Sequence, residues 1–287
     1  MAVLRNVIQD THRSLEVAGI PDARLEAEVM VMNVMRMPRQ SMFAEQETEV
    51  SGQQQETLDS HLKRRFDREP LAYILGQREF YGVSVMVTPA VLIPRPETEG
   101  LVEHALFMAL MGMESTELSI ADVGTGSGAI AINLAIHLPA AKIFAVDVAD
   151  EVLDVAAYNI RAHGVGDRVN LAIGDLLDAV PEPVDLIVAN LPYIPTERLP
   201  TLQPEVQKEP ALALDGGPDG LDLVRRLLVQ AEDKLKDHGI ILLELDPEQI
   251  PVVQELALKH FPGGSTSVEQ DLAHLDRILA IHRQAPE

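Results

Sequence analysis

The feature that most constrains the fold is an alternation of apolar strands and amphipathic helices that fills residues 101–287. Short, continuous apolar runs predict strands, and apolar residues at intervals of three and four predict the helices between them. Strands that are apolar throughout are buried on both faces, as in a mostly parallel sheet that helices cover on each side. The pattern therefore predicts an α/β fold with a doubly wound, mostly parallel sheet.

The expected elements of this region follow one another with short connections. Strands are expected at 118–123, 142–147, 169–174, 184–189, 239–245 and 277–282. Helices are expected at 129–138, 152–163, 221–236 and 250–259. A proline-rich loop separates the fourth strand from the helix that follows it. In a sheet of this kind, ligands bind at the carboxyl ends of the strands, so candidate site residues are sought there.

The first 75 residues carry a different, helical pattern. Apolar residues recur at helical intervals over 3–17, 23–37 and 57–66. Asp22 is available to cap the second of these helices, and Gly19 and Pro21 interrupt the chain before it. The sequence SGQQQ at 51–55 is expected to break the chain before the last helix. These signals predict a helical domain over residues 1–75, without a catalytic pattern inside it.

Residues 76–100 connect the two parts of the chain. The sequence EFYGVSVMV is typical of a short hairpin that turns at Gly82. Pro89, Pro94 and Pro96 then stiffen the following segment. We expect a hairpin and a proline-rich linker over 76–100, and a catalytic domain over 101–287.

The charge of the chain argues against a nucleic acid as the substrate. The formal net charge is −22, and residues 89–287 hold 13 basic against 32 acidic side chains. Nucleic-acid affinity depends on clustered Lys and Arg that neutralise phosphates. Aromatic residues, at 3%, are also too scarce for binding that relies on stacking against bases. We therefore expect no direct nucleic-acid partner.

Other features exclude whole classes of site. The chain has no cysteine, which rules out disulfides, thiolate metal ligands and a cysteine nucleophile. The nine histidines show no metal-ligand spacing, so no metal is expected. No segment reaches the roughly 18 apolar residues of a membrane span, and the first twenty residues carry charges throughout. We expect a cytoplasmic protein without a membrane partner.

A glycine-rich turn, DVGTGSG at 122–128, follows the first strand of the alternating region. Glycines at alternate positions let the backbone turn tightly and approach a ligand, and the following helix offers free N–H groups. The spacing G-x-G-x-G differs from the dinucleotide-binding and phosphate-loop patterns. The candidate cofactor-binding residues in this turn are Gly124, Thr125, Gly126, Ser127 and Gly128.

Acidic residues end the next two strands. Asp147 ends the second strand, where a carboxylate can accept both hydroxyl hydrogens of a ribose. Asp175 follows the third strand and is expected to reach an adenine amino group, while Leu176 packs on the ring. Together with the glycine turn, these residues predict an adenosine-type ligand, and the glycine spacing favours S-adenosylmethionine.

The fourth strand ends in the tetrapeptide Asn190, Leu191, Pro192 and Tyr193. It falls at the same sheet edge as the glycine turn, where a transferred methyl group should emerge. The Asn190 side-chain oxygen and the Leu191 carbonyl can accept the hydrogens of a planar amine or amide and aim its nitrogen at the methyl carbon. Tyr193 can cover the planar group, and Pro192 restricts Leu191 to extended geometry. We therefore expect these four residues to be catalytic and substrate-binding, with Asn190 also beside the cofactor.

These motifs together resemble the class I S-adenosylmethionine-dependent methyltransferases that methylate planar nitrogens, whose fold is Rossmann-like. The sequence LIPRPETEGLVEHAL, with FYG upstream of it, resembles more specifically the protein glutamine methyltransferases of the HemK/PrmC type. REPLAYILGQREFYG, EPALALDGGPDGLDLVRRLL and GIILLEL extend the similarity over residues 10–283. The resemblance implies methyl transfer to the side-chain amide nitrogen of the glutamine in the Gly-Gly-Gln motif of class 1 peptide chain release factors. It also implies that the helical domain recognises the release factor.

One residue departs from this family's pattern. The family tetrapeptide is usually Asn-Pro-Pro-Tyr, and Leu191 replaces the first proline. Asn-Leu-Pro-Tyr also resembles the rRNA adenine dimethyltransferases, so the tetrapeptide alone does not separate amide from adenine substrates. The PRPETE sequence and the acidic charge favour a protein substrate. The alternatives are glutamine methylation of a ribosomal protein, adenine methylation of rRNA or DNA, and a scaffold that binds the cofactor without catalysis.

Overall fold

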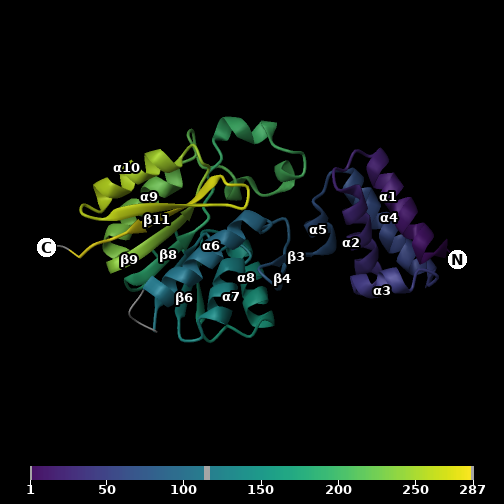
Figure 1. The fold of residues 1–287 in the computed structure, drawn as a ribbon, viewed down its shortest axis with the longest axis horizontal. Helices are drawn as coiled ribbons and strands as arrows, with labels where there is room; N and C mark the ends of the chain where they lie inside the picture. The colour runs from purple at the N-terminus through teal and green to yellow at the C-terminus, as the bar shows by residue number, and fades with distance from the viewer. Residues whose placement is uncertain (1, 113–116, 286–287) are drawn as a thin grey trace. The chain divides into compact units, whose positions relative to one another are not determined.

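The computed structural model describes residues 2–112 and 117–285 of the 287-residue chain. These residues form two compact units (Figure 1). The smaller unit runs up to Gly76 and includes Pro204–Lys208. The larger unit takes in Gln77–Gln203 and the chain from Glu209 onward. We call them the helical unit and the sheet unit.

The helical unit packs its helices around a core of aliphatic side chains and methionines. Its elements are β1 (Ala2–Val3), α1 (Leu4–Val17), α2 (Ala23–Met35), α3 (Arg39–Ala44), β2 (Glu49–Val50), α4 (Gly52–Phe66) and α5 (Leu71–Leu75). Leu4, Leu15 and Met30 are completely buried in the core that α1 and α2 share. The three helices expected from the sequence are confirmed as α1, α2 and α4.

Two local expectations in this unit are corrected. Residues 52–55 do not break the chain but form the first turn of α4, because Ser51 caps it. The Gln54 N–H donates to Ser51 Oγ at 3.3 Å, and the Ser51 N–H donates to Gln54 Oε1 at 2.9 Å. This reciprocal capping box pairs backbone donors that would otherwise lack partners. Asp22 does occupy the N-cap position of α2, but its side chain forms no capping hydrogen bond.

A buried arginine ties Pro204–Lys208 to the rest of the helical unit. Arg65, near the end of α4, is 3% exposed and pairs with Glu26 at 2.7 Å and with Glu205 at 2.8 Å. Arg68 also contacts Glu205, at 3.1 Å. A buried guanidinium needs such partners, because an unpaired charge in the interior is strongly unfavourable.

The sheet unit begins with the expected hairpin. Strands β3 (Gln77–Phe80) and β4 (Val83–Met86) pair antiparallel across a turn at Gly82. The proline-rich segment then leads directly into helix α6 (Pro96–Phe107). Pro96 is the first residue of that helix, where a missing N–H has no cost and the fixed φ favours helix. The expected linker over 76–100 therefore ends as helix.

Seven strands form the central sheet, in the order β10-β11-β9-β8-β5-β6-β7 (Figure 1). They are β5 (Ser119–Val123), β6 (Lys142–Asp147), β7 (Val169–Ile173), β8 (Val184–Ala189), β9 (Leu235–Glu244), β10 (Ser265–Gln270) and β11 (Asp276–His282). Strands β5 to β9 run parallel, and β11 and β10 are antiparallel additions at one edge. The expected doubly wound, mostly parallel sheet is confirmed. Its strand order reverses at β5, which lies between β6 and β8.

Helices cover both faces of the sheet. They are α6, α7 (Ala129–His137), α8 (Asp150–Ala162), α9 (Asp222–Lys234) and α10 (Ile250–His260). Ile187 and Ile241 share a core with Leu227 of α9 and Val253 of α10. Side chains alternate along a strand, so intervening residues such as Asp122 face the layer of α6 and α7.

The sequence analysis did not predict some of the elements. Strand β10 has the polar sequence STSVEQ and is formed by pairing with β11 at the sheet edge, so no apolar run marks it. The expected proline-rich loop contains three short 3₁₀ helices, η2 (Thr196–Thr201), η3 (Val206–Lys208) and η4 (Ala211–Ala213). Among the described residues, no helix combines the length and the apolar character needed to cross a membrane.

Candidate functional site

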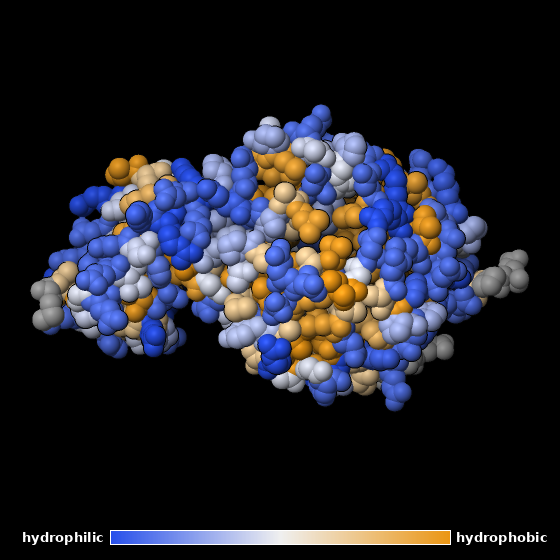
Figure 2. Space-filling view, turned by 180° about the vertical axis from the view of Figure 1, so that it is seen from behind, coloured by the Kyte–Doolittle hydropathy of each residue, from blue (hydrophilic) through white to orange (hydrophobic). Residues whose placement is uncertain are grey.

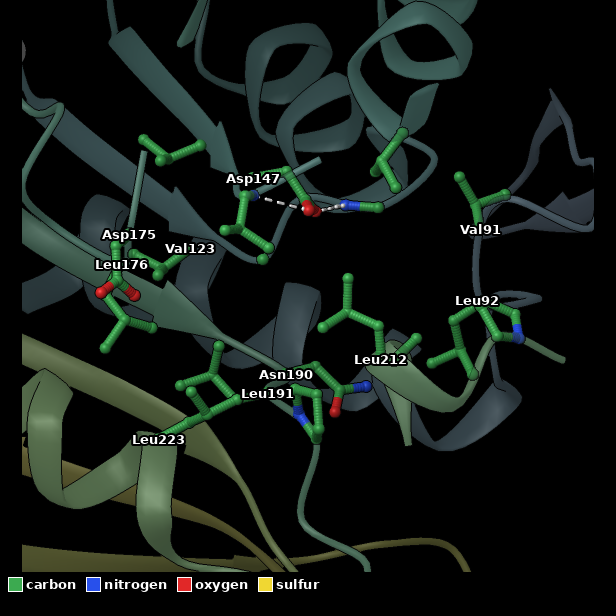
Figure 3. Close-up of a pocket in the computed structure, with 18 of the residues that line it drawn as sticks. Val91, Leu92, Val123, Asp147, Asp175, Leu176, Asn190, Leu191, Leu212 and Leu223 are labelled. Atoms are coloured by element: carbon green, nitrogen blue, oxygen red, sulfur yellow. Dashed lines mark hydrogen bonds between the residues drawn. The ribbon is translucent and has the colours of Figure 1, made fainter. Parts of the chain in front are cut away.

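A pocket of about 270 Å³ lies in the sheet unit, at the carboxyl ends of β5, β6 and β8 (Figure 3). Its lining is mainly apolar, with Val91, Leu92, Leu176, Leu212 and Leu223 among the side chains. Figure 2 likewise shows apolar residues gathered on one face of the sheet unit. An apolar pocket with a few polar groups at the reversal of a strand order is the usual form of a small-molecule site.

The glycine turn forms one wall of the pocket. Gly124, Gly126 and Gly128 have φ values of 74°, 56° and 81°, which residues with a side chain rarely adopt. Gly124 and Gly126 line the pocket, while Thr125 and Ser127 are buried beneath the turn. Gly128 is the N-cap residue of α7. Two of the five predicted residues therefore face the pocket, and the other three shape the turn.

Asp147 lies beside this turn, at the end of β6 (Figure 3). Its Oδ2 accepts a hydrogen bond from the Gly126 N–H at 3.0 Å, and its Oδ1 accepts one from the Val148 N–H at 2.8 Å. Burial raises the pKa of the Asp147 carboxyl, although these N–H donors oppose the shift. The side chain lines the pocket, so a ligand hydroxyl there can reach a carboxylate whose position is already fixed.

Asp175 and Leu176 line the pocket at the end of β7, as the sequence predicts (Figure 3). The Asp175 carboxylate forms an ion pair with Arg226 of α9, which also lines the pocket. Leu176 is buried in the core and adopts a positive φ of 57°. The sequence analysis missed Arg226, because nothing in a helical pattern distinguishes an arginine that faces a pocket from one that faces solvent.

Asp122, the first residue of the glycine-rich sequence, is completely buried under the turn. Its Oδ2 accepts hydrogen bonds from Thr125 Oγ1 at 2.6 Å and from the Ala131 N–H at 3.1 Å. Within the described chain, its Oδ1 has no hydrogen-bond partner. Burial raises the pKa of the Asp122 carboxyl to about 7, and the nearby charge of Asp147 adds to the shift. Asp122 therefore joins the glycine turn to the first turn of α7.

The tetrapeptide that follows β8 lies across the pocket from Asp147. Asn190, Leu191 and Pro192 line the pocket (Figure 3). The Asn190 Nδ2 donates a hydrogen bond to Thr98 Oγ1 at 2.9 Å. Tyr193 instead donates its hydroxyl hydrogen to Glu244 Oε1 at 3.4 Å, and it is not among the described residues that line this pocket.

The loop at 215–220 packs against the tetrapeptide. It leads into α9, and it packs closely against the backbone of Pro192 and Tyr193. Gly220 has a φ of 77°, and a Cβ there would overlap the Tyr193 carbonyl oxygen. The Gln249 Nε2 also donates to that oxygen, at 2.8 Å. The course of the chain after Tyr193 is therefore fixed by a glycine and a glutamine distant in sequence.

A buried glutamate, Glu209, joins two segments of the chain that line the pocket. Glu209 Oε2 accepts a hydrogen bond from the Ile93 N–H at 3.0 Å, and its Oε1 pairs with Arg95 at 2.5 Å. These contacts join residues 90–92 to residues 210–213, and both segments line the pocket. Sequence reasoning missed Glu209; the one signal for it is Arg95, a charged residue between Pro94 and Pro96.

The residues present fit an S-adenosyl ligand. The glycine turn exposes backbone to the pocket, Asp147 can accept ribose hydroxyls, and Leu176 and Leu191 offer apolar surface to a planar ring. Carboxylates near the pocket also favour a positively charged sulfur. Within the described ranges, no group of three or more His, Asp or Glu side chains is arranged to hold a metal ion.

Both units match families of known proteins. Residues 6–76 match the family model of the PrmC N-terminal domain, and residues 105–216 match that of ribosomal protein L11 methyltransferase (PrmA). A release factor glutamine methyltransferase from Moorella thermoacetica is 40% identical over 282 residues, which are 98% of this chain and 99% of that protein. Another, from Chlorobaculum tepidum, is 39% identical and covers 92% of each chain.

A solved structure shows the same fold. The catalytic domain of hMettl16, crystallised in complex with MAT2A 3'UTR hairpin 6, matches with a TM-score of 0.57. It is 17% identical to this chain and covers 76% of this chain and 82% of its own. At that identity the match concerns the fold alone. The sheet unit has the Rossmann-like class I methyltransferase fold that the sequence predicts.

Proposed function

The chain belongs to the release factor glutamine methyltransferases, and from that premise we propose that it methylates the glutamine of the Gly-Gly-Gln motif in class 1 peptide chain release factors. The methyl donor is S-adenosylmethionine, and the acceptor is the side-chain amide nitrogen of that glutamine. The pocket that Asp147, Leu176 and Asn190 line is the reaction site.

The observation that carries this proposal is the orientation of Asn190. Its Nδ2 is engaged by Thr98, which leaves the side-chain oxygen free to accept an amide hydrogen from a glutamine in the pocket. An amide nitrogen is a weak nucleophile because its lone pair is delocalised. Two acceptors on its hydrogens, the Asn190 oxygen and the Leu191 carbonyl, would hold the nitrogen with its π face toward the methyl carbon.

Bound S-adenosylmethionine supplies a methyl group on a positively charged sulfur, which leaves as neutral S-adenosylhomocysteine. A bond forms between the methyl carbon and the glutamine nitrogen as the carbon–sulfur bond breaks, and the nitrogen then loses a proton to water. The protein contributes mainly by holding the reactants together, an effect worth up to roughly 7–11 kcal/mol. Asp147 and the glycine turn hold the donor, and Asn190 with Leu191 and Pro192 holds the acceptor.

We assign recognition of the release factor to the helical unit, the predicted substrate-recognition domain over 1–75. Its match to the PrmC N-terminal domain supports this role. A protein substrate also agrees with the net charge of −22, which disfavours nucleic acids. The proposed reaction belongs in the cytoplasm, where release factors act in translation, and it requires no membrane.

A labelling experiment tests the proposal. The enzyme is incubated with a purified class 1 release factor and methyl-labelled S-adenosylmethionine, and the modified peptide is mapped by mass spectrometry. We expect one methyl group on the glutamine of the Gly-Gly-Gln motif, and none on a release factor in which glutamate replaces that glutamine. Label on a ribosomal protein or on rRNA, with none on the release factor, would select one of the alternatives instead.

A further inference from the structure

Two buried residues lie behind the tetrapeptide and outside the pocket lining. Thr98, in the first turn of α6, is 4% exposed, and Glu244, the last residue of β9, is 2% exposed. The Thr98 hydroxyl accepts the hydrogen bond from Asn190 Nδ2 at 2.9 Å and is itself hydrogen-bonded to the Glu244 carboxylate. Three elements far apart in sequence are thus linked in one buried chain of polar groups.

With Glu244 ionised, the hydrogen bonds that link Glu244, Thr98 and Asn190 can run in only one direction. An ionised carboxylate accepts hydrogen bonds and donates none, so the single hydroxyl hydrogen of Thr98 points to Glu244. The Thr98 oxygen then offers only lone pairs to Asn190. The amide nitrogen is the end of Asn190 that can donate to them, and the amide oxygen is left for the pocket.

Glu244 also contacts the other end of the tetrapeptide. Its Oε1 accepts the Tyr193 hydroxyl hydrogen at 3.4 Å. Its Oε2 is buried and has no hydrogen-bond partner among the described residues, so the carboxylate is held by few groups. Burial raises the pKa of Glu244, whereas Thr98, Arg277 and Tyr193 favour its ionised form.

We propose that Thr98 and Glu244 are positioning residues for methyl transfer, which set the amide of Asn190 with its oxygen toward the substrate. The inference rests on the proposed function, since it assigns the Asn190 oxygen to the substrate glutamine. Reversal of the amide would present a donor to the glutamine hydrogens and repel them. A buried hydroxyl such as that of Thr98, which has a partner on each side, can determine such an orientation, because an unpaired alternative is unfavourable.

Variants of Thr98 test this arrangement. We call the hydrogen-bonded series Glu244–Thr98–Asn190 the relay. Thr98→Val keeps the shape but removes the hydroxyl, and Thr98→Ser keeps the hydroxyl. We expect Thr98→Val to lower the single-turnover rate on release factor about 10-fold to 100-fold. A misplaced Asn190 oxygen no longer aims the glutamine nitrogen at the methyl carbon, and such misplacement lowers the rate of the chemical step. Dissociation constants for S-adenosylmethionine and KM for release factor should change less than about threefold, and Thr98→Ser should recover most of the rate.

Thr266→Val is the matched control. Thr266 is half-buried on the edge strand β10, and its hydroxyl accepts a hydrogen bond from Gln254 Nε2 at 3.0 Å. Its replacement also removes a hydroxyl with a side-chain partner, but one with no link to Asn190. The parental rate is expected for this variant.

A double-mutant cycle separates positioning from a general structural effect. If Thr98 acts through Asn190, then Thr98→Val should cost almost nothing further in an Asn190→Ala background. Glu244→Gln supplies a second approach that does not depend on Thr98 variants folding. The amide of the new glutamine can donate a hydrogen bond to Thr98, so the hydrogen bonds can also run in the opposite direction and the Asn190 amide can turn over. We expect the same loss of rate with retained cofactor binding.

The outcomes are distinct. An active parent whose rate is unchanged by Thr98→Val and by Glu244→Gln overturns the relay and leaves the proposed function standing. The relay is also overturned if the loss of rate in the double variant is the product of the losses caused by Thr98→Val and by Asn190→Ala. Thr98 would then act independently of Asn190, as a structural residue. A parent that methylates no release factor overturns the proposed function and the relay with it.

Discussion

The side chain of Leu191 packs directly over Gly124, so that a Cβ on the glycine would lie 3.2 Å from Leu191 Cδ2. This contact joins the glycine turn after β5 to the tetrapeptide after β8. Leu191 is buried at 5% exposure and belongs to the core of the sheet unit. The leucine that replaces the usual proline of the family is therefore a packing residue, and its side chain helps to hold the two halves of the site together.

Gly124→Ala should lower the affinity for S-adenosylmethionine at least about tenfold, since the new methyl group must displace Leu191 and the positive φ disfavours alanine. Isothermal titration calorimetry measures the change. Gly164→Ala is the matched control, because Gly164 has a similar φ of 68° but open space around its Cβ position. Shortening the leucine with Leu191→Ala in the same chain should restore part of the affinity; a double variant as weak as Gly124→Ala would contradict the contact.

Asp147→Ala should weaken cofactor binding by about 1.5–3 kcal/mol, the range for hydrogen bonds to a charged group. The variant loses the acceptor of the Gly126 N–H and the acceptor that we propose for the ribose hydroxyls. Calorimetric titration checks the affinity, and circular dichroism checks that the fold survives. Asp167→Ala, at a side chain that is 75% exposed, serves as the control. Unchanged affinity in Asp147→Ala would remove this residue from the site.

Asn190→Ala should reduce the single-turnover rate by about 100-fold or more, because the glutamine nitrogen loses an acceptor that aims it at the methyl carbon. Affinity for S-adenosylmethionine should stay within a few-fold of the parent, since Asp147 and the glycine turn remain. Quenched-flow assays on release factor measure the rate. Asn170→Ala, at an exposed position of β7, is the control. A near-normal rate in Asn190→Ala would make the tetrapeptide a structural turn only.

Asp122→Asn should change how stability depends on pH. The folded protein holds the Asp122 proton more tightly than the unfolded chain, because burial raises the pKa from 3.8 to about 7. Its contribution to stability is therefore full below pH 4 and is lost as the pH rises through 7. The asparagine variant has no such loss, so its free energy of unfolding relative to the parent should rise by on the order of 2–3 kcal/mol between pH 5 and pH 8. Urea titrations without cofactor measure this difference, and a constant difference across that range would refute it.

Deletion of residues 1–75 should leave cofactor binding and abolish methylation of intact release factor. The buried apolar residues of the sheet unit begin at Phe80, and the pocket lining begins at Ala90. The deletion therefore removes neither core nor pocket, but it removes the proposed recognition surface. Calorimetry and methyl transfer to release factor are the two measurements. Undiminished turnover by the shortened enzyme would show that the sheet unit selects its substrate without help.

The sequence by itself determined the elements whose signals are local. Apolar runs and helical periodicity located six of the seven sheet strands, and the glycine spacing marked the turn where Gly124 and Gly126 line the pocket. Asp147, Asp175 and Asn190 were recognised because each ends a strand, and parallel strands of one sheet end at the same edge. Strand β10 was missed because its polar residues become a strand only by pairing with β11.

Only the tertiary structure decided which distant residues support the site. Thr98, Glu209, Arg226 and Glu244 come from a helix start, a loop, a helix and a strand end, and no local pattern marks their roles. Thr98, Glu209 and Glu244 matter because they are buried beside polar partners, and Arg226 because it pairs with Asp175. The fold creates these contacts when it brings separate segments together. A buried carboxylate or hydroxyl must find its hydrogen-bond partner wherever the chain places one. That requirement is met in three dimensions, so it cannot be derived from spacing along the sequence.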